Sequence, residues 1–435
     1  MGKELLMKVL RHEKCNEIPW VPFAGVHAGY LKGYTAREVL MDPDKLYESL
    51  LEVHKLYTPD GMPIMFDLQI EAEILGCELM WAEDNPPSVR THPFEDEMID
   101  PKSLPLPKET DGRIPIVLDV MRRMKTAVGN DTALYGLTCG PLTLASHLRG
   151  SEFFMDMIEE PEYVEALMDY CADINIKMAD YYLDAGMDII AIVDPLVSQV
   201  SPSSFEELLA PAFIRIFDHI RKRKAISSFF VCGNATMQMQ VMCETHPDSI
   251  SVDENVDLIE AKKVTDQYNI TIGGNIPLTT TMLFGNQNDN MKYVVDLIDR
   301  ITKDNLVIIG RGAKNKGERP WLTKLSLKGS VLWEYELRNP QTHQPPACGG
   351  AEKVYVPDSN RLLCIDNGRL GWDQPMKGAG KAWLTVAQGD EVVSVQDRQL
   401  SLFDSAGSVK FSVQMTQEEE GFNATPALDA QGRIY

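Results

Sequence analysis

Short apolar runs alternate with longer helical stretches from about residue 18 to residue 303. The run DIIAIV, residues 188–193, reads as a buried strand, and an amphipathic helical pattern follows it. The same succession recurs at the runs GMPIMF, TALYGLT, ISSFFVC, SISV and ITIGGN. Apolar strands joined by helices predict a parallel sheet that helices cover. The number of units in one array favours an α/β fold of the (β/α)8 TIM-barrel type over an open sheet.

The segment SPSSFEELLAP, residues 201–211, begins the helix that follows the strand DIIAIV. Serine is a common N-cap residue, and acidic residues favour the first turn of a helix. Because Glu206 and Glu207 lie just downstream, we expect Ser203 or Ser204 to cap the helix.

The pattern changes after about residue 305, where short strands repeat with a spacing of 39 residues. One glycine and one aromatic residue recur at this spacing in each unit: Gly329, Gly368 and Gly407, and Trp333, Trp372 and Phe411. A period near 40 residues with short strands is typical of β-propeller blades. We therefore expect an all-β partial propeller of about three blades over 304–435, after a barrel over 1–303, with the aromatic residues packed between blades.

Charge and composition exclude several classes of partner. The formal net charge is −22 and no basic run occurs, which disfavours nucleic acid and anionic membranes. No window of 18 uncharged apolar residues occurs, and the first residues interleave charges with leucines, unlike a signal peptide. The eight cysteines are scattered without a CxxC pair, which predicts reduced thiols in a cytoplasmic protein.

Polar residues follow the predicted strands at the points where these end. Barrel active sites lie at the carboxyl ends of the strands, so these residues are the candidate site. They are His27, Asp67, Cys139, Asp194, Cys232, Asn234, Asp253, Glu254 and Asn275. Five of them also have a structural reading: Cys232 as a buried thiol, Asp194 and the two later acids as helix or turn caps, and Asn275 as a turn residue.

Several of these residues lie in motifs that resemble a known family. GPLTLASHLRG (140–150), VCGNAT (231–236), SVDENVDLIEAKK (251–263) and GGNIPLT (273–279) are similar to the uroporphyrinogen decarboxylase superfamily, and the similarity spans roughly residues 1–303. This superfamily contains uroporphyrinogen decarboxylases and zinc-dependent methyltransferases that move methyl groups from corrinoid proteins to thiols. The second half resembles a propeller of PQQ-like repeats, and a three-blade segment gives no basis for a bound PQQ.

The resemblance favours the methyltransferase branch. Decarboxylases carry an arginine-rich RQAGRY motif near the first strand, where this chain has FAGVHAGYLKGY without arginine. The methyltransferases hold zinc with a His-x-Cys and a later Gly-Cys, but Phe230 and Ala313 occupy two of these three ligand positions here. Only Cys232 remains of the three, and one thiolate is not a zinc site unless Asp194, Glu254, His27 or Cys139 replaces the missing ligands. The propeller repeats begin where the last βα unit of the barrel would fall, so we expect a barrel that lacks this unit. The stretch LVIIG, residues 306–310, fits either the eighth barrel strand or a first-blade strand.

The hypothesis is therefore methyl transfer from a methylated corrinoid, held by a partner protein, to a thiol acceptor. The resemblance implies zinc held partly by Cys232, with Asp194, Glu254 and Asp67 as catalytic groups. Substrate would be bound by His27, Asn234, Asn275 and Cys139. Two other readings remain open: decarboxylation of a tetrapyrrole, and a non-catalytic binding or scaffold protein, including an unnatural join of two partial domains.

Overall fold

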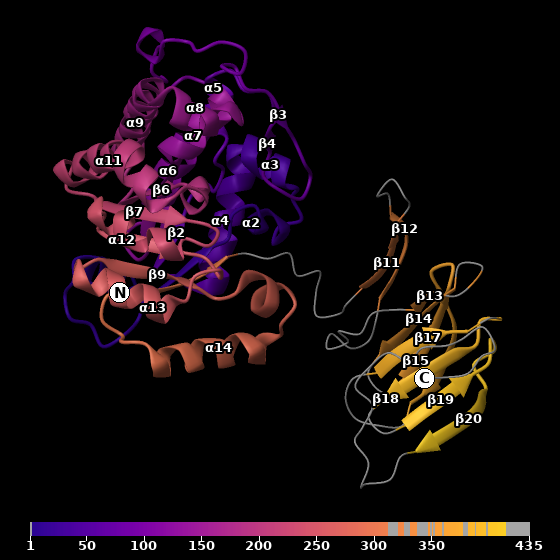
Figure 1. Ribbon diagram of the computed structural model, residues 1–435. Coiled ribbons are helices and arrows are strands. Elements are labelled where there is room, and N and C mark those ends of the chain that lie inside the picture. Colours follow the sequence, from indigo (N-terminus) through magenta and orange to yellow (C-terminus); the bar gives the residue numbers. More distant parts are fainter. Residues whose placement is uncertain are drawn as a thin grey trace. The chain divides into compact units, whose positions relative to one another are not determined.

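The computed structural model describes residues 2–311 without interruption and nine further stretches of the chain's second part. Those stretches are 321–325, 331–336, 347–348, 350, 353–358, 361–376, 382–387, 389–396 and 399–414. The chain divides into two compact units, Met1–Lys314 and Asn315–Tyr435 (Figure 1). The expected boundary at residues 303 and 304 falls shortly before the last strand of the first unit.

Eight parallel strands form the centre of the first unit, in the order β1-β10-β9-β8-β7-β6-β5-β2. Consecutive strands along most of this order are joined by helices, so the parallel pairing follows from the crossover connections. The strands are β1 Trp20–Phe23, β2 Gly61–Pro63, β5 Ala133–Cys139, β6 Ile189–Val193, β7 Ile226–Val231, β8 Ser249–Val252, β9 Thr271–Asn275 and β10 Leu306–Arg311. The sheet is a nearly closed TIM-type barrel, as the alternating pattern predicts.

Helices surround this sheet and carry its connections (Figure 1). The α-helices are α1 Gly2–Leu10, α2 His27–Tyr30, α3 Ala36–Met41, α4 Pro43–Tyr57, α5 Ile70–Ile74, α6 Ile114–Val128, α7 Pro141–Arg149, α8 Glu152–Glu159, α9 Pro161–Asp184, α10 Pro202–Ser204, α11 Ala210–Lys222, α12 Met239–Glu244, α13 Leu258–Gln267 and α14 Gln287–Arg300. Single turns are η1 Pro101–Ser103, η2 Pro195–Gln199, η3 Phe205–Leu209, η4 Thr236–Gln238 and η5 Leu278–Leu283, and a small hairpin joins β3 Leu79–Met80 to β4 Ser88–Val89.

The stretch 306–310 belongs to the barrel. Within β10, Ile308 pairs in parallel register with Trp20 of β1 and with Gly274 of β9. Of the two readings of this stretch, the eighth barrel strand is confirmed, because β10 occupies the eighth place in the wall, so the strand of the βα unit expected to be missing is present. An apolar strand with parallel neighbours on both sides buries both of its faces, and Leu306–Ile309 are all buried.

The cap of the helix after β6 differs from the prediction. Ser201 accepts a hydrogen bond from the Ser204 amide at 3.1 Å, because Pro202 occupies the first helical position. Proline favours this position, since it lacks the N–H group that would otherwise have no partner there.

Two layers of apolar side chains hold the barrel together. Inward-facing residues of alternate strand positions fill the interior, and α1 closes its amino-terminal end with Leu6, Val9 and Leu10. Outward-facing residues pack against the helices in a second, larger cluster. The two-residue period of a strand assigns each side chain to one layer or the other.

The second unit consists of small antiparallel sheets. The described strands form a pair β11-β12, a sheet β13-β14-β15-β16 and a sheet β17-β18-β19-β20. Their bounds are β11 Trp321–Leu325, β12 Val331–Glu336, β13 Ala347–Cys348, β14 Lys353–Asp358, β15 Arg361–Asp366, β16 Arg369–Pro375, β17 Ala382–Val386, β18 Val392–Gln396, β19 Gln399–Phe403 and β20 Val409–Gln414.

One of the repeated aromatic residues packs between two of these sheets. The ring of Trp372 on β16 stacks on Phe403 of β19 at 6.3 Å and contacts Tyr355 of β14 at 5.7 Å. Phe411, its equivalent one repeat later, is 41% exposed on β20. Gly329 lies outside the described residues. The partial-propeller prediction is confirmed as a class, with a tryptophan between neighbouring sheets.

Candidate functional site at the barrel mouth

Three phenylalanines form the floor of the barrel mouth. Phe23 on β1, Phe66 after β2 and Phe230 on β7 point into the interior, and Phe230 is 1% exposed. Their ring centroids are 5.2 Å apart for Phe23 and Phe230, 6.3 Å for Phe66 and Phe230, and 6.1 Å for Phe23 and Phe66. Phe23 meets the other two rings edge to face, and such packing stabilises an aromatic cluster beyond the area that it buries.

A small cavity of 30 Å³, about the volume of one water molecule, lies above this floor. It joins the carboxyl ends of β7, β8, β9 and β10. Its lining is Phe230, Val252, Asp253, Glu254, Asn275, Ile276, Leu278 and Ile309. These eight residues include two carboxylates and one amide, and none of the eight is cationic.

The turn after β7 places Cys232 beside this mouth. Gly233 adopts a φ of +88°, and a Cβ there would come 2.6 Å from the Ser198 hydroxyl. Its amide donates to the Asp253 carboxylate at 2.7 Å, which joins the ends of β7 and β8. Cys232 is partly buried against the interior apolar cluster.

Glu254 and Asn275 are brought together, as predicted from their positions after neighbouring strands. The Glu254 carboxylate accepts from the Thr279 amide at 3.1 Å and from the Thr279 hydroxyl at 2.8 Å. The side-chain amide of Asn275 donates to the backbone carbonyls of Asp253 at 2.8 Å and Val256 at 2.7 Å. Glu254 therefore holds η5 against the β8–α13 loop, and Asn275 fixes that loop to β9.

Asp194 lies behind the barrel wall. Its fully buried carboxylate accepts from the Leu142 amide at 2.9 Å and from the amide and hydroxyl of Thr143 at 3.1 and 2.5 Å. These donors belong to the first turn of α7, so Asp194 caps a helix that is remote in sequence. Burial raises the pKa of Asp194 to about 7, although these hydrogen bonds act to lower it.

Asp67 also lies in the layer between the wall and the helices. It forms an ion pair with the buried guanidinium of Arg113, which also donates to Glu73 at 2.7 Å. The Gln69 amide donates to the second Asp67 oxygen at 2.9 Å. With these partners Asp67 holds α5 to the start of α6.

Two residues of this layer were missed by sequence reasoning. Glu71 on α5 is 1% exposed, and burial raises its pKa to about 8. One of its oxygens accepts from the Cys139 amide at 3.4 Å, and the other has no hydrogen-bond partner among the described residues. Arg113 was missed as well. The signal for Glu71 is its position in QIEAEIL, where Ile70 and Ile74 share its apolar helix face.

The remaining predicted residues occupy three different environments. His27 begins α2, and burial lowers its pKa. Asn234 accepts from the amide and hydroxyl of Thr236 at 3.2 and 2.7 Å, which is an exposed turn of the kind asparagine favours. Cys139 is fully buried behind the wall, where burial and the nearby Glu71 raise the pKa of its thiol.

The described residues do not fit the zinc that the resemblance implies. Within that part of the chain, no three side chains of histidine, cysteine, aspartate or glutamate lie close enough together to hold a metal ion. Phe230 occupies the expected histidine position and packs into the aromatic floor, and Ala313 lies outside the described residues. Over the same residues, no helix has the length and apolar character needed to cross a membrane.

Known proteins resemble both parts of the chain. Methylcobamide:CoM methyltransferases MtbA of Methanosarcina acetivorans and Methanosarcina mazei are 28% and 27% identical to it, each over 66% of this chain and 86% of their own length. Uroporphyrinogen decarboxylase of Prochlorococcus marinus is 25% identical over 71% of this chain and 91% of its own. A solved methyltransferase from Methanosarcina mazei, 24% identical, has the same barrel fold with a TM-score of 0.64, over 72% of this chain and 93% of its own.

Two family profiles divide the chain between them. Residues 319–434 match the family described as outer membrane protein assembly factor BamB, which agrees with the small antiparallel sheets found there. Residues 1–314 match the family described as uroporphyrinogen decarboxylase and include all eight barrel strands. The chain therefore belongs, through its barrel, to the uroporphyrinogen decarboxylase family.

Proposed function

We propose that the barrel transfers a methyl group from a methylated corrinoid, presented by a partner protein, to a thiol acceptor at its mouth. The observation that carries the proposal is the lining of the mouth. Its aromatic floor suits a neutral methyl group, and the eight lining residues supply no cation for a polycarboxylate. The names of the methylcobamide:CoM methyltransferase relatives support the same reaction.

In this reaction the acceptor sulfur attacks the methyl carbon as the bond to the donor breaks. The donor keeps the electron pair of the broken bond, and the acceptor thiol gives up its proton. Glu254 is the group proposed to take this proton, because its carboxylate lines the mouth and is held in place by Thr279. General bases of this kind contribute about 10²–10⁴-fold to a rate.

The groups behind the wall act by positioning. Asp194 holds the first turn of α7 next to the end of β5, and Asp67 holds α5 through Arg113. Cys232 and Asn275 would contact the acceptor from the ends of β7 and β9. No step is assigned to zinc, since the described residues do not assemble its ligands.

The test uses the purified full chain with methylcobalamin and 2-mercaptoethanesulfonate. Loss of the methylcobalamin absorbance and appearance of the methylated thiol by mass spectrometry are the readouts. We expect Glu254→Gln to slow the reaction by about 10²-fold. Glu260→Gln is the matched control, since Glu260 is exposed on α13 and its carboxylate pairs with Lys263 alone among the described residues. A wild-type rate no faster than that of heat-denatured chain contradicts the proposal.

Decarboxylation is the alternative that the same preparation tests. A relative named uroporphyrinogen decarboxylase matches most of the barrel, so release of carbon dioxide from uroporphyrinogen is measured in parallel. Turnover there without methyl transfer would replace the proposal by a carboxy-lyase. Absence of both methyl transfer and decarboxylation in the wild-type chain would favour a non-catalytic protein.

A further inference from the structure

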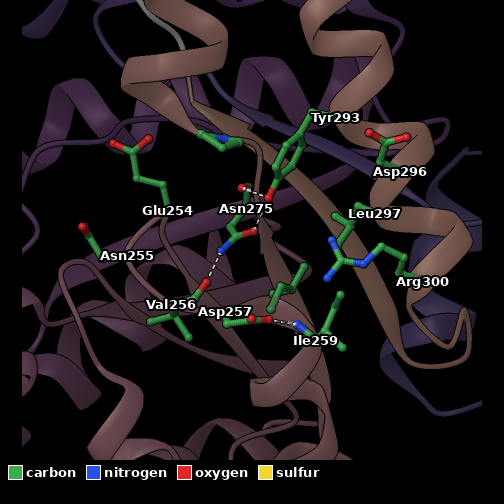
Figure 2. A pocket seen from close by; sticks show the side chains of 12 residues that line it. Glu254, Asn255, Val256, Asp257, Ile259, Asn275, Tyr293, Asp296, Leu297 and Arg300 are labelled. Carbon is green, nitrogen blue, oxygen red and sulfur yellow. Dashed lines mark hydrogen bonds between the residues drawn. The ribbon is translucent and has the colours of Figure 1, made fainter.

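A second and larger cavity lies beside the barrel mouth. It has a volume of 470 Å³ and opens between the β8–α13 loop and α14 (Figure 2). Cavities of this size hold small organic molecules. Glu254 and Asn275 line both cavities, so the larger one is a neighbour of the mouth. Nothing in the methyl-transfer proposal uses it.

The lining of the larger cavity includes an arginine and an aspartate of α14. Arg300 near the end of α14 extends toward Asn275, and Glu254 lies on the other side of Asn275 in Figure 2. Asp296 precedes Arg300 by one helical turn, a spacing at which opposite charges commonly pair. Neither side chain forms an ion pair or hydrogen bond with any described residue, although both line the cavity.

The charges of the lining have both signs. Arg300 supplies a guanidinium, which binds a carboxylate through two parallel hydrogen bonds. Glu254 and Asp296 supply carboxylates, of which that of Glu254 also accepts from Thr279. The carboxylate of Asp257 is engaged by the amides of Ile259 and Glu260 at 2.9 and 3.2 Å. A purely anionic ligand would be repelled by the acids and a purely cationic one by the arginine, so the set favours a ligand with both charges.

The rest of the lining is apolar or neutral. Val256, Leu258 and Leu297 are buried beneath the cavity and present an aliphatic wall. The Tyr293 hydroxyl lies 3.2 Å from the side-chain oxygen of Asn275, which orients both polar groups at the cavity's centre. This wall accommodates an aliphatic or aromatic side chain.

We propose that this cavity binds an α-amino acid with an apolar side chain. Arg300 binds its carboxylate, Glu254 faces its ammonium group, and Val256, Leu258 and Leu297 contact its side chain. The site shares Glu254 and Asn275 with the barrel mouth, but its binding test makes no use of the donor, the acceptor thiol or the aromatic floor.

Calorimetric titration of the full chain with L-leucine and L-phenylalanine tests the site. We expect at least one of them to bind with a Kd below about 1 mM. For leucine, the comparison ligands are 4-methylpentanoate, which lacks the ammonium group, and 3-methylbutylamine, which lacks the carboxylate. Each should bind at least about tenfold more weakly, because each loses one of two charge-assisted contacts.

Arg300→Gln should weaken amino-acid binding at least about tenfold, while Lys292→Gln should leave it unchanged. Lys292 is an exposed cation of the same helix that does not line the cavity. Tyr293→Phe provides a second lining variant, and circular dichroism confirms that each variant is folded. Absence of binding by both amino acids, equal binding of 4-methylpentanoate, or unchanged binding by Arg300→Gln would each overturn the proposal.

Discussion

The ring of Phe230 lies 5.2 Å from that of Phe23 and meets it at 76°, on the floor of the barrel mouth. Phe230 stands two residues before Cys232, where a metal-binding histidine is expected from the resemblance. Because Phe230 is buried in an aromatic cluster, no side chain at this position offers a nitrogen to a metal. The mouth of this barrel is therefore organised around an apolar floor.

The first prediction concerns metal content. Purified chain should contain less than stoichiometric zinc by inductively coupled plasma mass spectrometry, and Cys232→Ala should not change that content, because one thiolate does not make a zinc site. Cys15→Ala serves as the control for a partly buried cysteine elsewhere. One zinc per chain that disappears in Cys232→Ala, but not in Cys15→Ala, would show that ligands assemble around Cys232.

The second prediction concerns pH. The pKa of Glu71 is about 8 in the folded chain and near its ordinary value of 4.5 in the unfolded one. Between these values the folded state keeps a proton that the unfolded state releases, so this residue makes stability fall as pH rises from about 5 to 8, by at most about 1.4 kcal/mol per pH unit.

Glu71→Gln removes this titration. The stability of the variant relative to the wild type should therefore increase between pH 5 and pH 8, as measured by urea unfolding followed by circular dichroism. Exposed Glu78→Gln is the control and should track the wild type at every pH. A difference between Glu71→Gln and wild type that does not vary with pH would refute the assignment.

The third prediction concerns the cap of α7. Asp194→Ala should destabilise the barrel by about 3 kcal/mol, because it leaves buried donors of Leu142 and Thr143 without an acceptor. Asp257→Ala, which removes an exposed cap from α13, should cost about 1 kcal/mol. Urea unfolding measures both. Equal losses would mean that burial adds nothing to the role of Asp194.

The fourth prediction compares two equivalent positions of the 39-residue repeat. Trp372→Ala should destabilise the second unit by about 2 kcal/mol, since its half-buried ring contacts Phe403 and Tyr355 across two sheets. Phe411→Ala should cost less than about 0.5 kcal/mol, because Phe411 is 41% exposed. Limited proteolysis of the full chain at increasing temperature distinguishes the two variants. Equal sensitivity of the two variants would show that the sheets do not depend on Trp372.

The sequence by itself determined the strands, the fold class and the 39-residue repeat. SISV at 249–252 coincides with β8, and the runs that begin at Gly61 and Thr132 contain β2 and β5. These features depend on the order of apolar and polar residues along the chain, which a local pattern records directly. The same pattern placed Glu254 and Asn275 after neighbouring strands, and the structure brings both to the mouth.

Only the tertiary structure decided which candidates face the mouth. Asp194 and Glu254 both follow apolar strands, yet Asp194 caps α7 behind the wall and Glu254 lines the mouth. The side of the wall on which a side chain emerges depends on strand register and on the helix that packs nearby. The tertiary structure likewise decided that residues 306–310 complete the barrel, because the pairing partners of β10 lie 34 residues away in β9 and 288 residues away in β1, beyond the reach of any local pattern.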